Sequence, residues 1–155
     1  MDCCICSSIR LIPARVLPAT RFFGSEIFTR GAFVTGSGGV AFEASARIAT
    51  AASGIVAGIF GYNFNDTTRL HDEIDFESLG NDAVAGRRRE ETNVYSNEPL
   101  GAGHPRFVPD GDLTAFHTYR IECFPDRVRW LIDNQLVRED TGHVPQNPLR
   151  FHLNL

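Results

Sequence analysis

The chain is built from short apolar or alternating runs separated by turn residues, and this rhythm constrains its fold more than any other feature. In VAFEASARIA, apolar and polar residues alternate with the period of two that is typical of a half-buried strand. Glycine- and proline-rich breaks such as TGSGG and VPQNP end the runs. The runs leave no room for crossover helices. The sequence therefore predicts an all-β fold over residues 24–155, an antiparallel sandwich of seven to nine strands.

Composition and charge exclude several classes of protein. With 155 residues the chain has the length of one domain. A fold of that size buries roughly 68–70% of its unfolded surface and needs no metal or disulfide to hold a core. A net charge of -4 argues against a nucleic-acid partner, which needs a basic surface. All 15 basic side chains are arginine, and the absence of lysine excludes Schiff-base and P-loop lysine chemistry.

Residues 1–23 lack the pattern of short strands that the rest of the sequence shows. They are predicted to form a loose tail before the domain at 24–155. They lack the basic start and unbroken apolar core of a signal peptide. The longest nearly apolar stretch, residues 54–64, is too short to span a bilayer, so we predict no membrane partner. No C-x-x-C pair supports a zinc site, so we predict no metal. The cysteines of the tail are Cys3, Cys4 and Cys6.

The segment HDEIDFESLG alternates ionisable and apolar residues along a predicted strand. Ile74 and Phe76 are expected to face a core, and like charges on the other face disfavour one another's ionisation. One interpretation is a glycosidase site, where one carboxyl is an anion and another holds a proton. A solvated strand face and a Ca²⁺ site are the alternatives. The ionisable residues on the shared face are His71, Glu73, Asp75 and Glu77.

The same segment resembles the active-site strand of glycoside hydrolase family 16, whose pattern is Glu-x-Asp-x-Glu. The resemblance continues along the chain. ASGIVAGIF is similar to the strand that leads to the active site, ETNVY to a substrate-contacting strand, and FHTYRIECFPDRVRWLIDN to a later segment of the family. It covers about residues 24–155 in the same order. The resemblance implies a concanavalin A-like jelly roll with the catalytic strand in its concave sheet.

By this resemblance, Glu73 is the nucleophile and Glu77 is the general acid/base, while Asp75 between them tunes both pKa values. His71 would contact sugar near the cleavage point, although an ordinary polar strand residue explains it equally well. The predicted substrate contacts on the ETNVY strand are Asn93, Glu91 and Tyr95.

The sequence departs from the family pattern in two places. It ends at Leu155, where family members continue with a tryptophan-bearing loop and further strands. We therefore expect a C-terminally truncated domain with an exposed sheet edge, marginal stability and weak activity. Gly61 stands where related enzymes place an aromatic residue, which predicts one missing sugar platform. Trp130 and Cys123 are both predicted to lie in the core.

The leading functional hypothesis is an endo-acting hydrolase of β-linked glucan or a related polysaccharide. A transglycosylase that uses the same intermediate and a carbohydrate-binding domain without catalysis are the alternatives. Each implies a polysaccharide partner, no cofactor and a monomer. The resemblance implies an extracellular location, which the missing signal peptide contradicts unless the start is misassigned or the chain is a fragment.

The spacing of the two glutamates predicts retention of anomeric configuration. Glu73 and Glu77 are four residues apart, so their Cα atoms lie roughly 13 Å apart at about 3.3 Å per residue. Each side chain can lean roughly 4 Å toward the other, which leaves about 5 Å between the carboxyl groups. Retaining glycosidases have a separation of about 5–5.5 Å, whereas inverting enzymes need about 6.5–9.5 Å to seat a water.

Overall fold

The computed structural model describes residues 24–35, 38–48 and 52–155. The predicted tail, with its three cysteines, lies outside the described residues. The described residues form one short helix and ten strands: β1 (Glu26–Phe28), β2 (Val40–Ala46), β3 (Val56–Asn65), β4 (Leu70–Leu79), α1 (Gly80–Val84), β5 (Arg89–Pro99), β6 (Arg106–Pro109), β7 (His117–Phe124), β8 (Arg127–Ile132), β9 (Gln135–Asp140) and β10 (Arg150–Asn154).

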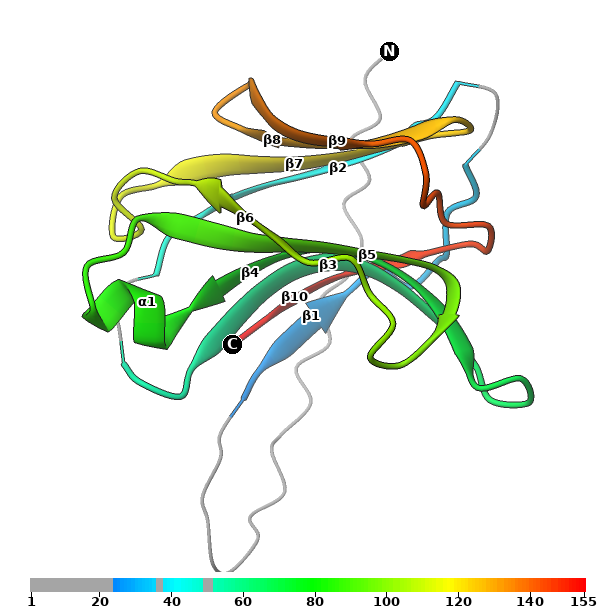
Figure 1. Ribbon diagram of the computed structural model, residues 1–155, viewed down its shortest axis with the longest axis horizontal. Coiled ribbons are helices and arrows are strands. Elements are labelled where there is room, and N and C mark those ends of the chain that lie inside the picture. Colours follow the sequence, from blue (N-terminus) through cyan, green and yellow to red (C-terminus); the bar gives the residue numbers. More distant parts are fainter. Residues whose placement is uncertain (1–23, 36–37, 49–51) are drawn as a thin grey trace, which may run out of the picture.

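The strands make two antiparallel sheets packed face to face, as Figure 1 shows. The larger sheet has the order β1-β10-β3-β4-β5-β6, and the smaller has the order β2-β7-β8-β9. The ends of the long strands β3 and β4 bend away from the smaller sheet, so the outer face of the larger sheet is concave (Figure 1). The predicted antiparallel sandwich is confirmed.

The prediction of seven to nine strands is wrong by a small margin, because two edge strands carry weak signals. The edge strand β6 is only four residues long and includes a proline. The edge strand β9 has the sequence QLVRED, in which polar residues interrupt the alternation. Edge strands need no continuous apolar face, so their sequences resemble loops.

The core lies between the sheets and is formed by the inward residues of both. Trp130 of β8 is fully buried, and Cys123 of β7 is 1% exposed, which confirms both predictions. Phe76 of β4 meets Tyr119 of β7 edge to face, with ring centroids 5.4 Å apart. No described helix is long and apolar enough to cross a membrane.

A buried carboxylate on β4 binds both the end of β5 and the loop before β10. Asp72 lies on the inner face of β4 and is fully buried. Its Oδ1 accepts hydrogen bonds from the backbone N–H groups of Asn97 at 2.8 Å and Gln146 at 3.1 Å. Its Oδ2 accepts hydrogen bonds from Asn147, through the backbone N–H at 3.0 Å and the side-chain amide at 2.6 Å. Such charge-assisted bonds compensate the burial of the charge.

Candidate active site

The strand β4 separates its ionisable side chains from its apolar ones, as the sequence predicts. Ile74 and Phe76 are at most 1% exposed and point into the core. Glu73, Asp75 and Glu77 point to the opposite, concave face, because alternate residues of a strand face opposite sides. Because β4 is an inner strand of the larger sheet (Figure 1), the three carboxyl groups follow one another along the middle of that sheet.

The register of β3 and β5 against β4 places a flanking residue on each side of every carboxyl. Directly opposed residues in antiparallel strands share a face, so these flanking residues also belong to the concave side. The predicted substrate contacts Asn93, Glu91 and Tyr95 lie on β5, next to β4, and their contact with substrate stays a prediction. The three rows are Tyr62, Glu73 and Tyr95; Phe60, Asp75 and Asn93; and Gly58, Glu77 and Glu91.

The core holds the middle of this strand in place from behind. The indole N–H of Trp130 crosses from the smaller sheet and donates a 2.8 Å hydrogen bond to the backbone carbonyl of Asp75. Both groups are buried, so the bond is shielded from competing water. The position of the central carboxyl is thus tied to the packing of the core.

Burial is the main electrostatic feature of the site, and it raises the pKa of all three carboxyl groups. Burial and then the charge of Glu77 raise the pKa of Glu73 to about 7. Burial raises the pKa of Asp75 well above its usual range, and the charges of Glu73 and Glu77 add to this. Burial also raises the pKa of Glu77, and the charge of Glu91 raises it further. The site therefore holds protons near neutral pH, where exposed carboxyls are ionised.

Asp75 is the most buried of the three carboxyls and has an unsatisfied oxygen. It is 3% exposed, and its Oδ1 has no hydrogen-bond partner in the described residues. Because its raised pKa favours the protonated form, Asp75 has a proton to donate to an adjacent carboxylate. This fits the tuning role predicted for it.

His71 lies two residues before Glu73 on the same face of β4, but its side chain is almost completely buried. The residue is 1% exposed, and its ring packs against that of Tyr95 in a tilted arrangement, with centroids 4.1 Å apart. Its Nδ1 lies 2.9 Å from the backbone oxygen of Glu98, and its Nε2 lies 3.3 Å from Oε2 of Glu73. A contact with sugar stays a prediction.

A stack of rings next to β4 was not predicted from the sequence. The ring of His152 on β10 lies between Phe60 of β3, at 4.8 Å, and Phe28 of β1, at 5.4 Å. Its Nδ1 is 2.9 Å from a carboxylate oxygen of Glu26. In the sequence, only the alternation of β3 points to this group of rings. The strands β1 and β10 are more than a hundred residues apart in the chain, so no local pattern brings their rings together. Aromatic faces of this kind bind sugar rings.

Comparison with known proteins identifies the family. Residues 13–155 match the family described as glycosyl hydrolases family 16. The chain belongs to this family. It is 34% identical over 106 residues to a beta-glucanase of Bacillus subtilis, covering 66% of this chain and 41% of the relative. It is 33% identical over 143 residues to a beta-glucanase of Fibrobacter succinogenes, covering 87% of this chain and 39% of the relative.

Solved structures of family 16 relatives share the architecture. The apo Crh5 transglycosylase superposes with a TM-score of 0.67 at 27% identity, over 88% of this chain and 54% of that one. The family jelly roll predicted from the sequence is thus confirmed. The chain spans about two fifths of the length of the two beta-glucanases, so the activity of a complete family member is a proposal for this chain.

The sequence predicts that Gly61 leaves out an aromatic residue on the sugar-binding face of β3. This prediction is wrong, because Gly61 faces the other side of the strand. A side chain at Gly61 would point into the core, toward the rings and methyl groups of Phe151 and Leu149. The glycine is required there by the packing of β10 against β3. The concave face of β3 carries its neighbours Phe60 and Tyr62, and both are aromatic.

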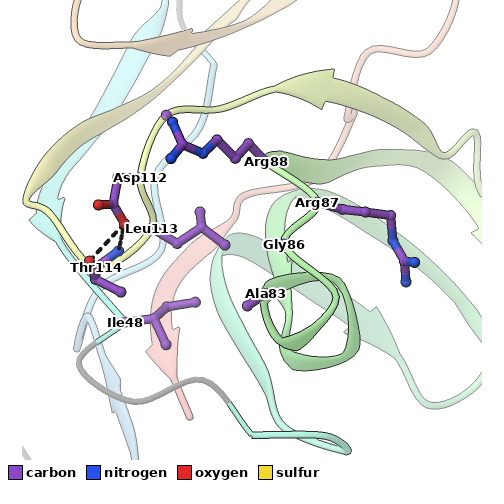
Figure 2. A pocket seen from close by; sticks show the side chains of 9 residues that line it. Ile48, Ala83, Gly86, Arg87, Arg88, Asp112, Leu113 and Thr114 are labelled. Carbon is purple, nitrogen blue, oxygen red and sulfur yellow. Dashed lines mark hydrogen bonds between the residues drawn. The ribbon is translucent and has the colours of Figure 1, made fainter.

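A separate hollow of about 190 Å³ lies near α1 and the loop before β7 (Figure 2). Figure 2 shows Ile48 and Leu113 lining it, with Arg87 directed away. Asp112 at its rim accepts hydrogen bonds from the backbone N–H and the hydroxyl of Thr114, at 3.0 and 2.7 Å. None of the predicted site residues lines this hollow. The described residues also contain no cluster of His, Cys, Asp or Glu that could hold a metal ion.

Proposed function

We propose that this family 16 chain is a retaining, endo-acting glycoside hydrolase of a β-linked glucan or a related polysaccharide. The observation that carries the proposal is the row of Glu73, Asp75 and Glu77 on the concave face of the larger sheet. A pair of carboxyl groups flanking a glycosidic bond is the chemical requirement for its hydrolysis.

In the first step, a carboxylate oxygen of Glu73 forms a bond to the anomeric carbon of the sugar. The bond from that carbon to the glycosidic oxygen breaks, and its electron pair goes to the oxygen. Glu77 donates its proton to the departing oxygen, so the leaving saccharide is a neutral alcohol. The product is a covalent glycosyl ester on Glu73 and an ionised Glu77.

In the second step, Glu77 acts as a base. It accepts a proton from water while the water oxygen bonds to the anomeric carbon and the ester bond to Glu73 breaks. Two displacements at one carbon restore the original configuration. The four-residue spacing of the glutamates, about 13 Å between Cα atoms, lets inclined side chains reach the separation that this route needs.

The protonation states required are opposite for the two glutamates. Glu77 must hold a proton when substrate binds, and burial together with Glu91 raises its pKa in that direction. Glu73 must be an anion, although burial raises its pKa to about 7. We therefore expect the activity to depend steeply on pH just below neutrality, because Glu73 is increasingly protonated there.

The substrate class rests on the surroundings of the carboxyls and on the relatives. The rings of Phe28, Phe60, Tyr62 and Tyr95 share the face of the carboxyls, and such rings pack on sugars. The two relatives quoted above are beta-glucanases. Because such polymers lie outside cells, we propose an extracellular site of action.

The test is release of reducing sugar from a panel of β-glucans, with proton NMR of the first product. We expect the β-anomer to appear first, and an initial α-anomer would rule out Glu73 as the nucleophile. The variant Glu73→Ala should lose turnover and regain it with azide, giving an inverted glycosyl azide. The matched control is Asp126→Ala, which removes a carboxyl at the exposed start of β8 and should leave activity unchanged.

The second candidate function is transglycosylation, favoured by the likeness to the Crh5 transglycosylase. The two activities differ only in what accepts the sugar from the ester on Glu73. With labelled oligosaccharide acceptors, a transglycosylase gives longer labelled products, whereas a hydrolase gives free reducing ends. A protein that binds these polymers without turning them over would be a carbohydrate-binding domain, and the proposal of catalysis would fall.

A further inference from the structure

The buried ring of His71 has a defined arrangement of its two nitrogens. The backbone oxygen of Glu98 lies 2.9 Å from Nδ1, and a carbonyl oxygen can only accept a hydrogen bond. Nδ1 therefore carries a hydrogen. The other nitrogen, Nε2, is buried and has no hydrogen-bond partner in the described residues. Oε2 of Glu73 lies 3.3 Å from Nε2.

Two acceptors cannot face one another here without cost. If the ring of His71 is neutral, its unprotonated Nε2 lies 3.3 Å from a carboxylate oxygen of Glu73, which is too close for a water molecule to lie between them. A buried polar atom left in this way costs about 1–3 kcal/mol. A proton placed between Nε2 and Glu73 removes the conflict and converts it into an ion pair or a neutral hydrogen bond.

We propose that His71 holds this proton on Nε2 and thereby keeps the carboxylate of Glu73 ionised and oriented for attack. His71 is then a positioning residue for the nucleophile. The proposal rests on the proposed function, because only a glycosidase nucleophile must be an anion. It also explains how Glu73 can act as a carboxylate in a buried site with Glu77 nearby, where burial favours its protonated form.

The surroundings of His71 leave Glu73 as the carboxylate that faces its Nε2. The carboxyl of Glu98 is engaged with His104 at 3.0 Å and with the backbone N–H of Ser96 at 3.1 Å. Asp72 lies on the opposite face of the strand and is saturated by hydrogen bonds. Other titratable or charged groups packed around the ring or its aromatic neighbours are Tyr62 of β3, Tyr95 of β5, His152 of β10 and Arg69, whose guanidinium lies over Phe64.

The first test needs no substrate. Proton–nitrogen correlation NMR of the labelled chain follows the imidazole nitrogens between about pH 5 and about pH 8, with His71 assigned by its loss in His71→Gln. We expect both ring nitrogens of His71 to carry protons at the acid end of this range and near neutrality. In Glu73→Gln the amide can donate to Nε2, so the ring should become neutral with its hydrogen on Nδ1. A ring that is already neutral in the unaltered protein throughout the range overturns the proposal.

The second test uses the pH profile of kcat/KM. In His71→Phe the cation is lost, so the acid limb of the profile should move to higher pH by about one unit, a tenfold loss of activity on that limb. His71→Gln keeps a neutral donor and should move the limb less. His117→Gln is the matched control, because His117 pairs with Asp133 on the smaller sheet and should leave the profile unchanged.

The outcomes separate this proposal from the proposed function and from a sugar contact. A raised KM with an unmoved acid limb in both His71 variants would mean that His71 binds substrate, and the proposal would be wrong. If the unaltered chain turns over no glycan but NMR finds His71 doubly protonated beside Glu73, the proton-sharing pair stands while the glycosidase proposal fails.

Discussion

Replacing Asp72 with Asn tests how much the buried carboxylate on the inner face of β4 contributes to the domain. The change keeps the shape of the side chain but gives it one acceptor oxygen and one donor group. Whichever way the amide is turned, two of the four donors that now point at Asp72 meet an NH₂ group instead. These donors come from Asn97 near the end of β5 and from Gln146 and Asn147 in the loop before β10.

The expected loss follows from those two contacts. A hydrogen bond to a charged group contributes about 1.5–3 kcal/mol, so losing two costs about 3–6 kcal/mol. Removing the buried negative charge returns part of this, because the neutral amide is cheaper to bury. We therefore expect Asp72→Asn to lower the free energy of unfolding by about 3 kcal/mol, a large share of the roughly 5–15 kcal/mol typical of a domain.

Urea unfolding followed by tryptophan fluorescence measures this change, because Trp130 is the only tryptophan and is buried in the core. Asp126→Asn is the matched control. Asp126 pairs with Arg127 at the surface, and we expect a change within about 0.5 kcal/mol. If the free energy of unfolding of Asp72→Asn lies within about 1 kcal/mol of that of the unaltered protein, the carboxylate does not hold β5 and the loop before β10 in place, and the reasoning is refuted.

Two further changes probe the core behind the site. Burial raises the pKa of Glu90 to about 8, from an ordinary value of 4.5, so the folded chain binds a proton that the unfolded chain releases. Stability should therefore fall as pH rises from about 4.5 to about 8, and Glu90→Gln should flatten that fall in urea unfolding at a series of pH values. Trp130→Phe removes the hydrogen bond to the carbonyl of Asp75 and should cost about 2–3 kcal/mol by the same method, with a lower kcat.

The sequence was most informative where a local period decides the structure. In HDEIDFESLG the alternation assigns each carboxyl to one face and each apolar residue to the other, and the sheet obeys it. The position of Gly61 could not be assigned in this way. The face of an isolated glycine becomes visible only from its neighbours across the sheet, here Phe151 and Leu149. The resemblance to related enzymes suggested that residue 61 faces the substrate, whereas the packing shows that it faces the core.

Contacts between distant segments were beyond the sequence. The ring of His152 is sandwiched by Phe28 and Phe60 because β10 pairs with both β1 and β3, and no local pattern specifies that order. The partner of His71 depends on an irregularity in the pairing of β4 with β5, near Asn97, which has a positive φ of 56°. Such a bulge turns a backbone carbonyl toward a side chain, and only coordinates reveal it.

The two faces of β4 are energetically linked, and this linkage explains why the site can hold buried carboxyls at all. On the concave face, burial makes ionised carboxylates costly, as the raised pKa of Glu73 indicates. On the inner face, the same strand is held by Asp72, which binds the backbone of β5 at Asn97, and by the indole of Trp130, which binds the backbone at Asp75. These contacts oppose the movement that would otherwise bring water to the carboxyls. Weakening them should therefore change the pH dependence of the site as well as the stability of the fold, because hydrated carboxyls lose their raised pKa.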